Sequence, residues 1–197
     1  MKNCVTTLSI AFTIALPHAA HAQSVTPPPV PASLEVPAPN EAFLLGRGVG
    51  TQNYVCQLSS SLGRVAWTLF TPQATLFSDQ GDQLTTHFFS PNPVEGGIVR
   101  VTWQDSRDTS TVWARVIASV ADPTASGAIA WLKLQMVGKK VGPTGGDTLS
   151  RTTFIQRLNT VGGSAPATGC DIPTDIGRKA FVPYTADYFF YKAPSSN

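Results

Sequence analysis

The chain offers little of the chemistry that hydrolases use, and His87 is where any search for it begins. His87 is the single imidazole beyond the first 22 residues. A histidine oriented by a carboxylate is the base of Ser-His-Asp hydrolases, so His87 with Asp105 or Asp108 forms the catalytic hypothesis, a small hydrolase or lyase. The Gly-x-Ser-x-Gly turn that presents a serine nucleophile is absent from the sequence. A histidine at the end of an apolar strand is also typical of a structural residue.

Asp105 and Asp108 also raise the possibility of glycoside chemistry. They lie in one short segment between Trp103 and Trp113, with Arg107 between the acids. Two carboxyl groups about 5 to 10 Å apart across a cleft serve as acid and base in glycosidases. The same pattern is typical of a solvated turn held by side-chain to backbone hydrogen bonds.

Aromatic and cationic residues suggest binding instead. Trp103, Trp113 and Trp131 are candidates for stacking on a sugar ring or an apolar surface, and Trp131 shares its strand face with Lys133. Core packing is the alternative role for all three tryptophans. Arg157 is a further ligand candidate, and if it is buried it needs an acidic partner, for which Asp187 is the expected residue.

The sequence lacks the residues that metal and nucleotide sites need. One histidine and two cysteines beyond residue 22 supply too few ligands for a zinc site. The glycine run at 46–50 is followed by a strand pattern rather than a helix, which favours a bulge or strand crossing over dinucleotide binding. The glycine-rich loop at 142–148 lacks the lysine that a phosphate-binding loop carries before its last threonine, here Thr148. We therefore expect no metal and no cofactor.

The N-terminus has the pattern of an export signal. Residues 1–22 combine a lysine, an apolar run and the small-x-small sequence Ala20-His21-Ala22, which predicts cleavage near Ala22. The apolar run is too short to span a bilayer. We expect an exported protein, periplasmic or extracellular, with no membrane span. Cys56 and Cys170 are then expected to form a disulfide.

Charge and composition limit the classes of partner and indicate how the chain divides into domains. The net charge of +2 gives no electrostatic basis for binding nucleic acid. Proline-rich residues 23–40 are expected to form a tether, and residues 41–197 a single domain. An unknown extracytoplasmic protein or a polysaccharide is the expected partner.

Strand patterns recur along the whole of that domain. In residues 128–137, Ala130, Leu132, Leu134 and Met136 form one face, and residues 180–191 alternate in the same way. No segment has the spacing of an amphipathic helix over a helical length. The sequence predicts an all-β, single-domain antiparallel β-sandwich or closed barrel with long loops and one disulfide.

Several segments together resemble a known family, the secreted bacterial and fungal proteins called domain of unknown function 3455. The matching segments are GVGTQNYVC at 48–56, Trp67, ATLF at 74–77, THF at 86–88, AIAWL at 128–132, TFIQRLNTVGG at 153–163, Ala165-Pro166, Cys170 and VPYTADYFFY at 182–191. Residues 90–97 lengthen the loop after His87 relative to the family pattern. The resemblance implies no established activity. Some fungal relatives carry a malate dehydrogenase label, and the missing nucleotide fold argues against transferring it.

Two functional classes follow from the sequence, with a third beside them. The preferred hypothesis is an exported binding module for an extracytoplasmic partner or polysaccharide. The alternative is the small hydrolase or lyase that uses His87 with an aspartate. An envelope structural protein without a small ligand is the third possibility.

Overall fold

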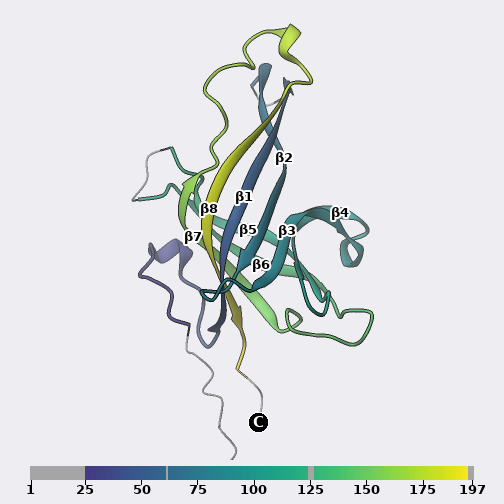
Figure 1. Ribbon diagram of the computed structural model, residues 1–197. Helices are drawn as coiled ribbons and strands as arrows, with labels where there is room; N and C mark the ends of the chain where they lie inside the picture. Colours follow the sequence, from purple (N-terminus) through teal and green to yellow (C-terminus); the bar gives the residue numbers. More distant parts are fainter. Residues whose placement is uncertain (1–24, 61, 124–126, 195–197) are drawn as a thin grey trace, which may run out of the picture.

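Eight antiparallel strands of the described chain close into a barrel in which each strand pairs with its neighbours in sequence (Figure 1). The computed structural model describes residues 25–60, 62–123 and 127–194. The elements are η1 (Ala32–Leu34), β1 (Glu41–Ser59), β2 (Arg64–Phe77), β3 (Gln83–Asn92), η2 (Pro93–Glu95), β4 (Ile98–Asp105), β5 (Thr111–Val120), β6 (Trp131–Lys140), β7 (Thr152–Gly162), η3 (Pro173–Asp175) and β8 (Lys179–Lys192). Pairing of β8 with β1 closes the ring. The all-β class is confirmed, and of the two predicted architectures the barrel is the one formed.

The export signal and its cleavage site lie outside the described residues. Across the part of the chain that the structure does describe, no helix is long and apolar enough to cross a membrane.

Alternating side chains fill the barrel, as the strand pattern requires. From β8, Tyr184, Ala186, Tyr188 and Phe190 all join one core cluster together with Trp103 of β4. The apolar face predicted for residues 128–137 contributes Leu132, Leu134 and Met136 to the same cluster. The periodicity in the sequence therefore identified the inward face of both strands.

The glycine run at 46–50 belongs to β1 and serves packing. A Cβ atom at Gly48 would lie 2.7 Å from Cε2 of Tyr188, and one at Gly50 would overlap the carbonyl oxygen of Gln73. Glycine is thus required where the backbone of β1 meets a large ring from β8 and the backbone of β2. A nucleotide fingerprint is not needed to explain this run.

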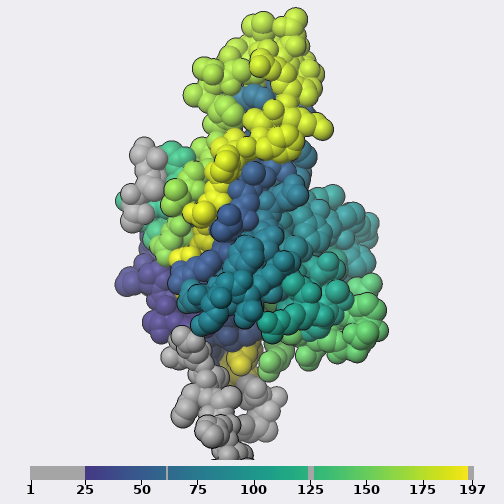
Figure 2. All heavy atoms as spheres, viewed as in Figure 1, coloured from purple at the N-terminus to yellow at the C-terminus, as the bar shows by residue number. Residues whose placement is uncertain are grey.

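Three strands continue beyond the ring as an arm. It consists of residues 53–59 of β1, 64–71 of β2 and 179–183 of β8, since β2 pairs with β3 only from Ala74 onward. Figures 1 and 2 show this arm projecting from one end of the barrel, with the β7–β8 connection folded over its tip. The predicted disulfide Cys56–Cys170 is confirmed and joins that connection to the arm.

The proline-rich segment packs against the outside of the barrel from Val25 onward (Figure 1, purple). Leu34 is fully buried in a cluster with Trp131, Leu158 and Phe189. The side-chain amide of Gln156 donates to the carbonyl oxygen of Leu34 at 2.8 Å. The segment that its prolines predicted to be a tether thus packs against the barrel over these residues. Proline prevents regular hydrogen bonding but leaves the apolar residues between the prolines free to pack.

Replacing Leu34 with alanine tests this packing. We expect the substitution to lower the free energy of unfolding by about 2 kcal/mol, since a buried leucine loses contacts and leaves a cavity. Urea denaturation followed by circular dichroism measures the change. Glu35→Ala is the matched control, because this neighbouring side chain is exposed and its loss should change little. Equal stability of Leu34→Ala and the wild-type protein would show that the segment does not contribute to the fold.

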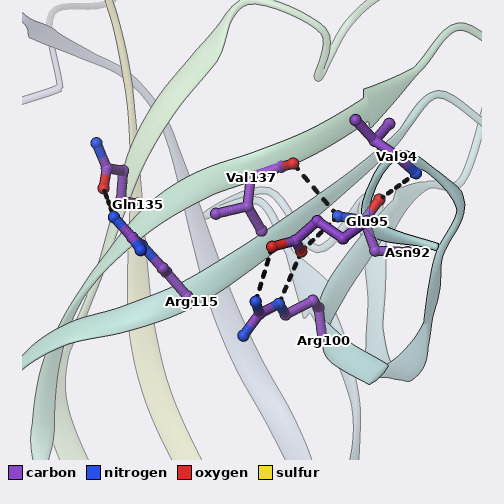
Figure 3. A network of polar contacts seen from close by, with 7 residues as sticks. All are labelled: Asn92, Val94, Glu95, Arg100, Arg115, Gln135 and Val137. Carbon is purple, nitrogen blue, oxygen red and sulfur yellow. Dashed lines mark hydrogen bonds and ion pairs between the residues drawn. The ribbon is translucent and has the colours of Figure 1, made fainter. Parts of the chain in front are cut away.

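The longer loop after His87 forms a compact β3–β4 connection (Figure 3). Asn92 caps η2 by accepting from the backbone of Val94 at 3.1 Å, and its amide reaches the carbonyl oxygen of Val137 on β6. Glu95 accepts two hydrogen bonds from Arg100, at 2.7 and 2.8 Å. These bonds, with one from Asn92, lower the pKa of Glu95 to about 2. The loop is therefore anchored to β4 and β6 rather than left free above His87.

Candidate functional site

His87 lies inside the barrel on β3, only 2% exposed. Its ring stacks on Trp103, the residue opposite on β4, with centroids 4.4 Å apart and planes 14° from parallel. Nδ1 lies 3.0 Å from the carbonyl oxygen of Thr102, and since a carbonyl only accepts, Nδ1 carries the proton. Burial lowers the pKa of His87 to about 3. The imidazole is therefore neutral at physiological pH.

Asp105 and Asp108 stabilise a turn at the end of β4. Oδ1 of Asp105 accepts from the backbone N–H groups of Arg107 and Asp108 at 2.8 and 2.9 Å. Asp108 accepts from the backbone N–H groups of Ser110 and Thr148 at 2.8 and 2.9 Å.

Two effects act on the Asp108 carboxyl. Burial raises its pKa, but the hydrogen bonds from Ser110 and Thr148 outweigh it and hold the pKa well below the usual range. Neither Asp105 nor Asp108 hydrogen-bonds the His87 ring, whose one such bond within the described residues goes to Thr102. The structure thus does not bring the predicted catalytic pair together.

The tryptophans proposed for stacking are buried. Trp103 is fully enclosed in the core, and Trp113 is 6% exposed. Trp131 is 4% exposed beneath the N-terminal segment, and its indole N–H donates to Asp122 at 2.6 Å. Trp131 does lie on the strand face opposite the core, as predicted, but that face is covered by the N-terminal segment. None of the three provides an exposed platform for a sugar ring.

A cavity of about 410 Å³ opens inside the barrel at the end that carries the arm. Five polar side chains line it: Gln52 and Tyr54 from β1, His87 from β3, Arg157 from β7 and Ser164 from the segment after β7. The remaining lining is apolar: Leu69, Pro72, Phe89, Val101, Val116, Ala128, Ile129, Ala130, Leu132 and Ala165. A few polar groups in a mostly apolar wall are typical of small-molecule sites.

Arg157 lines this cavity because it occupies one of the alternate positions of β7 that face the inside of the barrel. It shares its inward face with Ile155, a core residue, while Leu158 packs against the outer cluster. Nε and one Nη of Arg157 donate to the carbonyl oxygen of Ala130, at 3.2 and 2.9 Å.

Asp187, the expected partner of Arg157, is engaged elsewhere. It pairs with Arg47 at 2.8 Å and accepts from the amide of Asn159 at 2.8 Å. The register places Arg157 opposite Tyr188 and Asp187 opposite Leu158. The expected ion pair does not form, because neighbouring residues of a strand face opposite sides of the sheet.

The charge of Arg157 affects the pKa values of the ionisable rings around it. It opposes the rise in the pKa of Tyr54 and of Tyr188 that burial causes, and adds to the lowering for His87. The hydroxyl groups of Tyr184 and Tyr188 lie 2.9 Å apart. Burial and the neighbouring Tyr188 raise the pKa of Tyr184 far above its usual range. Both tyrosines therefore stay neutral, and Arg157 is the only charged group among the residues that line the cavity.

Gln52 was not among the residues singled out from the sequence. It is 2% exposed, and its side-chain nitrogen lies beside the Tyr184 hydroxyl but makes no hydrogen bond of standard geometry in the described part of the chain. Tyr54, two residues on, donates its hydroxyl hydrogen to the carbonyl oxygen of Gly163 at 2.6 Å. The sequence did contain a signal for these two residues. Gln52 and Tyr54 occupy every second position after Gly48 and Gly50, so they continue the inward face of β1.

Two other features of the described residues bear on the choice of site. A wider hollow of about 700 Å³ lies at the bend between the barrel and the arm, lined mainly by threonine and apolar residues of β1 to β3 and by Phe181. No group of three or more metal-ligating side chains occurs in the described residues. Of these two hollows, the barrel cavity is the one lined by a charged side chain, that of Arg157.

Fold and cavity together define a small closed antiparallel barrel with an interior cavity. A family model described as protein of unknown function (DUF3455) matches residues 37–192, so the chain belongs to that family, as the sequence resemblance predicted. No curated protein and no solved structure matches the chain.

Proposed function

We propose that the protein is an exported binding protein that takes a small molecule with an apolar body into the barrel cavity. The observation that carries the proposal is the cavity itself. Its volume of about 410 Å³ lies within the range of about 300 to 1,000 Å³ usual for small-ligand sites. Its polar groups are few, and four of the five lie on strands of the barrel, which hold their positions without help from a ligand.

Binding is favoured over catalysis by the state of His87. A general base works best with a pKa near the working pH, and the pKa of His87 is about 3. Asp105 and Asp108 hold a turn through backbone hydrogen bonds and do not orient the ring. A hydrolase or lyase built on these three residues has little geometric support.

A small ligand is favoured over a polysaccharide by the burial of the tryptophans. Sugar polymers are commonly bound on exposed aromatic faces, whereas Trp103 and Trp131 are at most 4% exposed. Export is supported by the disulfide Cys56–Cys170, because such bonds persist mainly in oxidising compartments.

A tryptophan at the cavity mouth tests the proposal. Ala165 is exposed and lines the cavity, whereas Ala167 is exposed in the same loop and does not line it. The probe is the neutral dye N-phenyl-1-naphthylamine, whose fluorescence rises in apolar surroundings. We expect saturable binding of one dye to the wild-type protein and to Ala167→Trp, with at least ten-fold weaker binding to Ala165→Trp because the new ring blocks the mouth. Absence of saturable binding, or equal binding by the two variants, would contradict the proposal.

A further inference from the structure

Arg157 carries a charge inside the barrel, and none of the ion pairs among the described residues includes it. Two of its nitrogens donate to the carbonyl oxygen of Ala130, and its side chain also hydrogen-bonds the Tyr188 hydroxyl, which stays neutral. None of the described residues that line the cavity is acidic. Arg157 is partly buried, and even partial removal of a cation from water without an anion is unfavourable. A site of this kind is completed by a ligand that brings the negative charge.

Gln52 supplies a second, independent indication. Gln52 lines the same cavity, and its buried side-chain nitrogen lies beside the Tyr184 hydroxyl without a hydrogen bond of standard geometry in the described part of the chain. A buried donor without an acceptor is costly. A ligand oxygen that reached this nitrogen would satisfy it, and a carboxylate provides such an acceptor together with its charge.

We propose that the ligand is an organic monocarboxylate, bound through its carboxylate by Arg157 and Gln52 and through its hydrocarbon body by the apolar cavity wall. This inference rests on the proposed function, since it assumes that the cavity takes a small molecule. The apolar wall includes Leu69, Phe89 and Ile129. One guanidinium in the cavity balances one negative charge, which suits a carboxylate better than a phosphate dianion.

Matched pairs of acid and amide test the inference. The probes are straight-chain carboxylates of six to twelve carbons and 3-phenylpropanoate, each beside its primary amide, which keeps the shape and removes the charge. Isothermal titration calorimetry measures their dissociation constants with the wild-type protein. We expect the best-bound carboxylate to bind at least ten-fold more tightly than its amide, because a charge-assisted pair is stronger than a neutral one.

Three arginine variants separate the charge from the fold. Arg157→Gln should lose the preference for acid over amide, and Arg157→Lys should retain part of it, since the positive charge remains. Arg151→Gln is the outer control, because Arg151 is exposed on the segment that precedes β7 and does not line the cavity. It should behave as the wild-type protein does. Thermal unfolding of each variant shows whether it is folded, and if Arg157→Gln is not, the comparison of Arg157→Lys with the wild-type protein decides.

The two proposals fail in different ways. Carboxylate and amide binding equally well, or an unchanged preference in Arg157→Gln, would overturn the carboxylate inference and leave the cavity as a binding site. Failure of every acid and every amide to bind also overturns the carboxylate inference. The neutral dye with Ala165→Trp then decides the proposed function separately, because the dye needs no charge in the cavity.

Discussion

Replacing Trp103 with alanine is expected to lower the free energy of unfolding by about 3 to 5 kcal/mol, the range for a buried tryptophan truncated in a packed core. Trp103 is fully buried and meets aromatic rings on three sides. It stacks on His87 at 4.4 Å and lies edge-on to Tyr188 and Phe190, at 5.9 and 6.2 Å. Its loss opens a cavity between β3, β4 and β8 that these rigid strands close only partly. Urea denaturation followed by tyrosine fluorescence or circular dichroism measures the change.

Trp103→Phe is the matched control for this prediction. It retains a ring at the same place, and it removes an indole N–H that is buried without a partner in the described residues. Removing an unsatisfied donor offsets part of the lost packing. We therefore expect a loss of only about 1 kcal/mol. A loss below that value for Trp103→Ala would show that the aromatic cluster does not stabilise the barrel.

Side-chain alternation was enough to predict the class of fold and the inward face of single strands. Tyr184, Tyr188 and Phe190 lie inside the barrel because they occupy every second position of β8. Closure of the sheet was beyond this reasoning. Pairing of β8 with β1 depends on contacts between the two ends of the domain, and a sandwich requires the same alternation within each strand.

Register between strands explains what the sequence missed at the site. Arg157 and Asp187 each lie in a strand with clear alternation. Whether the two side chains face the same side of the sheet depends on how β7 and β8 are aligned. Irregular pairing between Leu158 and Val161 accompanies a positive φ of 50° at Asn159. A single strand gives no indication of such a bulge in its pairing. Arg157 was named as a ligand candidate, but its unpaired state was visible only in the assembled barrel.

Coverage by a distant segment explains the change in the expected role of Trp131. Its face also carries Lys133, which predicts an exposed surface. In the structure Lys133 donates to the backbone carbonyl oxygen of Glu35 at 3.0 Å, and Trp131 lies in the cluster around Leu34. Apolar residues spaced between prolines were the signal for this docking, since a free tether has no need of them.

The disulfide is expected to contribute about 3 to 5 kcal/mol to stability, because it closes a long loop in the unfolded chain. Its two cysteines are separated by 114 positions in the sequence. In the native state Cys56 and Cys170 pack with Val65 and Trp67. The indole N–H of Trp67 also donates to the carbonyl oxygen of Thr168 at 3.0 Å. Cross-link and packing therefore both hold the β7–β8 connection on the arm.

The double variant Cys56→Ala with Cys170→Ala separates these two contributions. Its urea denaturation is compared with that of the wild-type protein, oxidised and fully reduced. The difference between the oxidised and reduced wild-type proteins measures the cross-link, and the difference between the reduced protein and the variant measures the packing of the sulfur atoms. We expect the first difference to be much the larger. Similar midpoints for the oxidised and reduced proteins would show that hydrogen bonds and packing hold the connection without the cross-link.

Loosening of the arm should also reach the cavity. Leu69 of β2 and Tyr54 of β1 belong to the arm and line the cavity, and Cys56 lies two residues beyond Tyr54 on the same face of β1. If the disulfide holds this rim in place, the reduced protein should bind N-phenyl-1-naphthylamine more weakly than the oxidised protein while the barrel stays folded. Stability and binding then fall together because the connection between β7 and β8 secures one wall of the cavity. Unchanged dye binding after reduction would show that the ring of strands alone shapes the cavity.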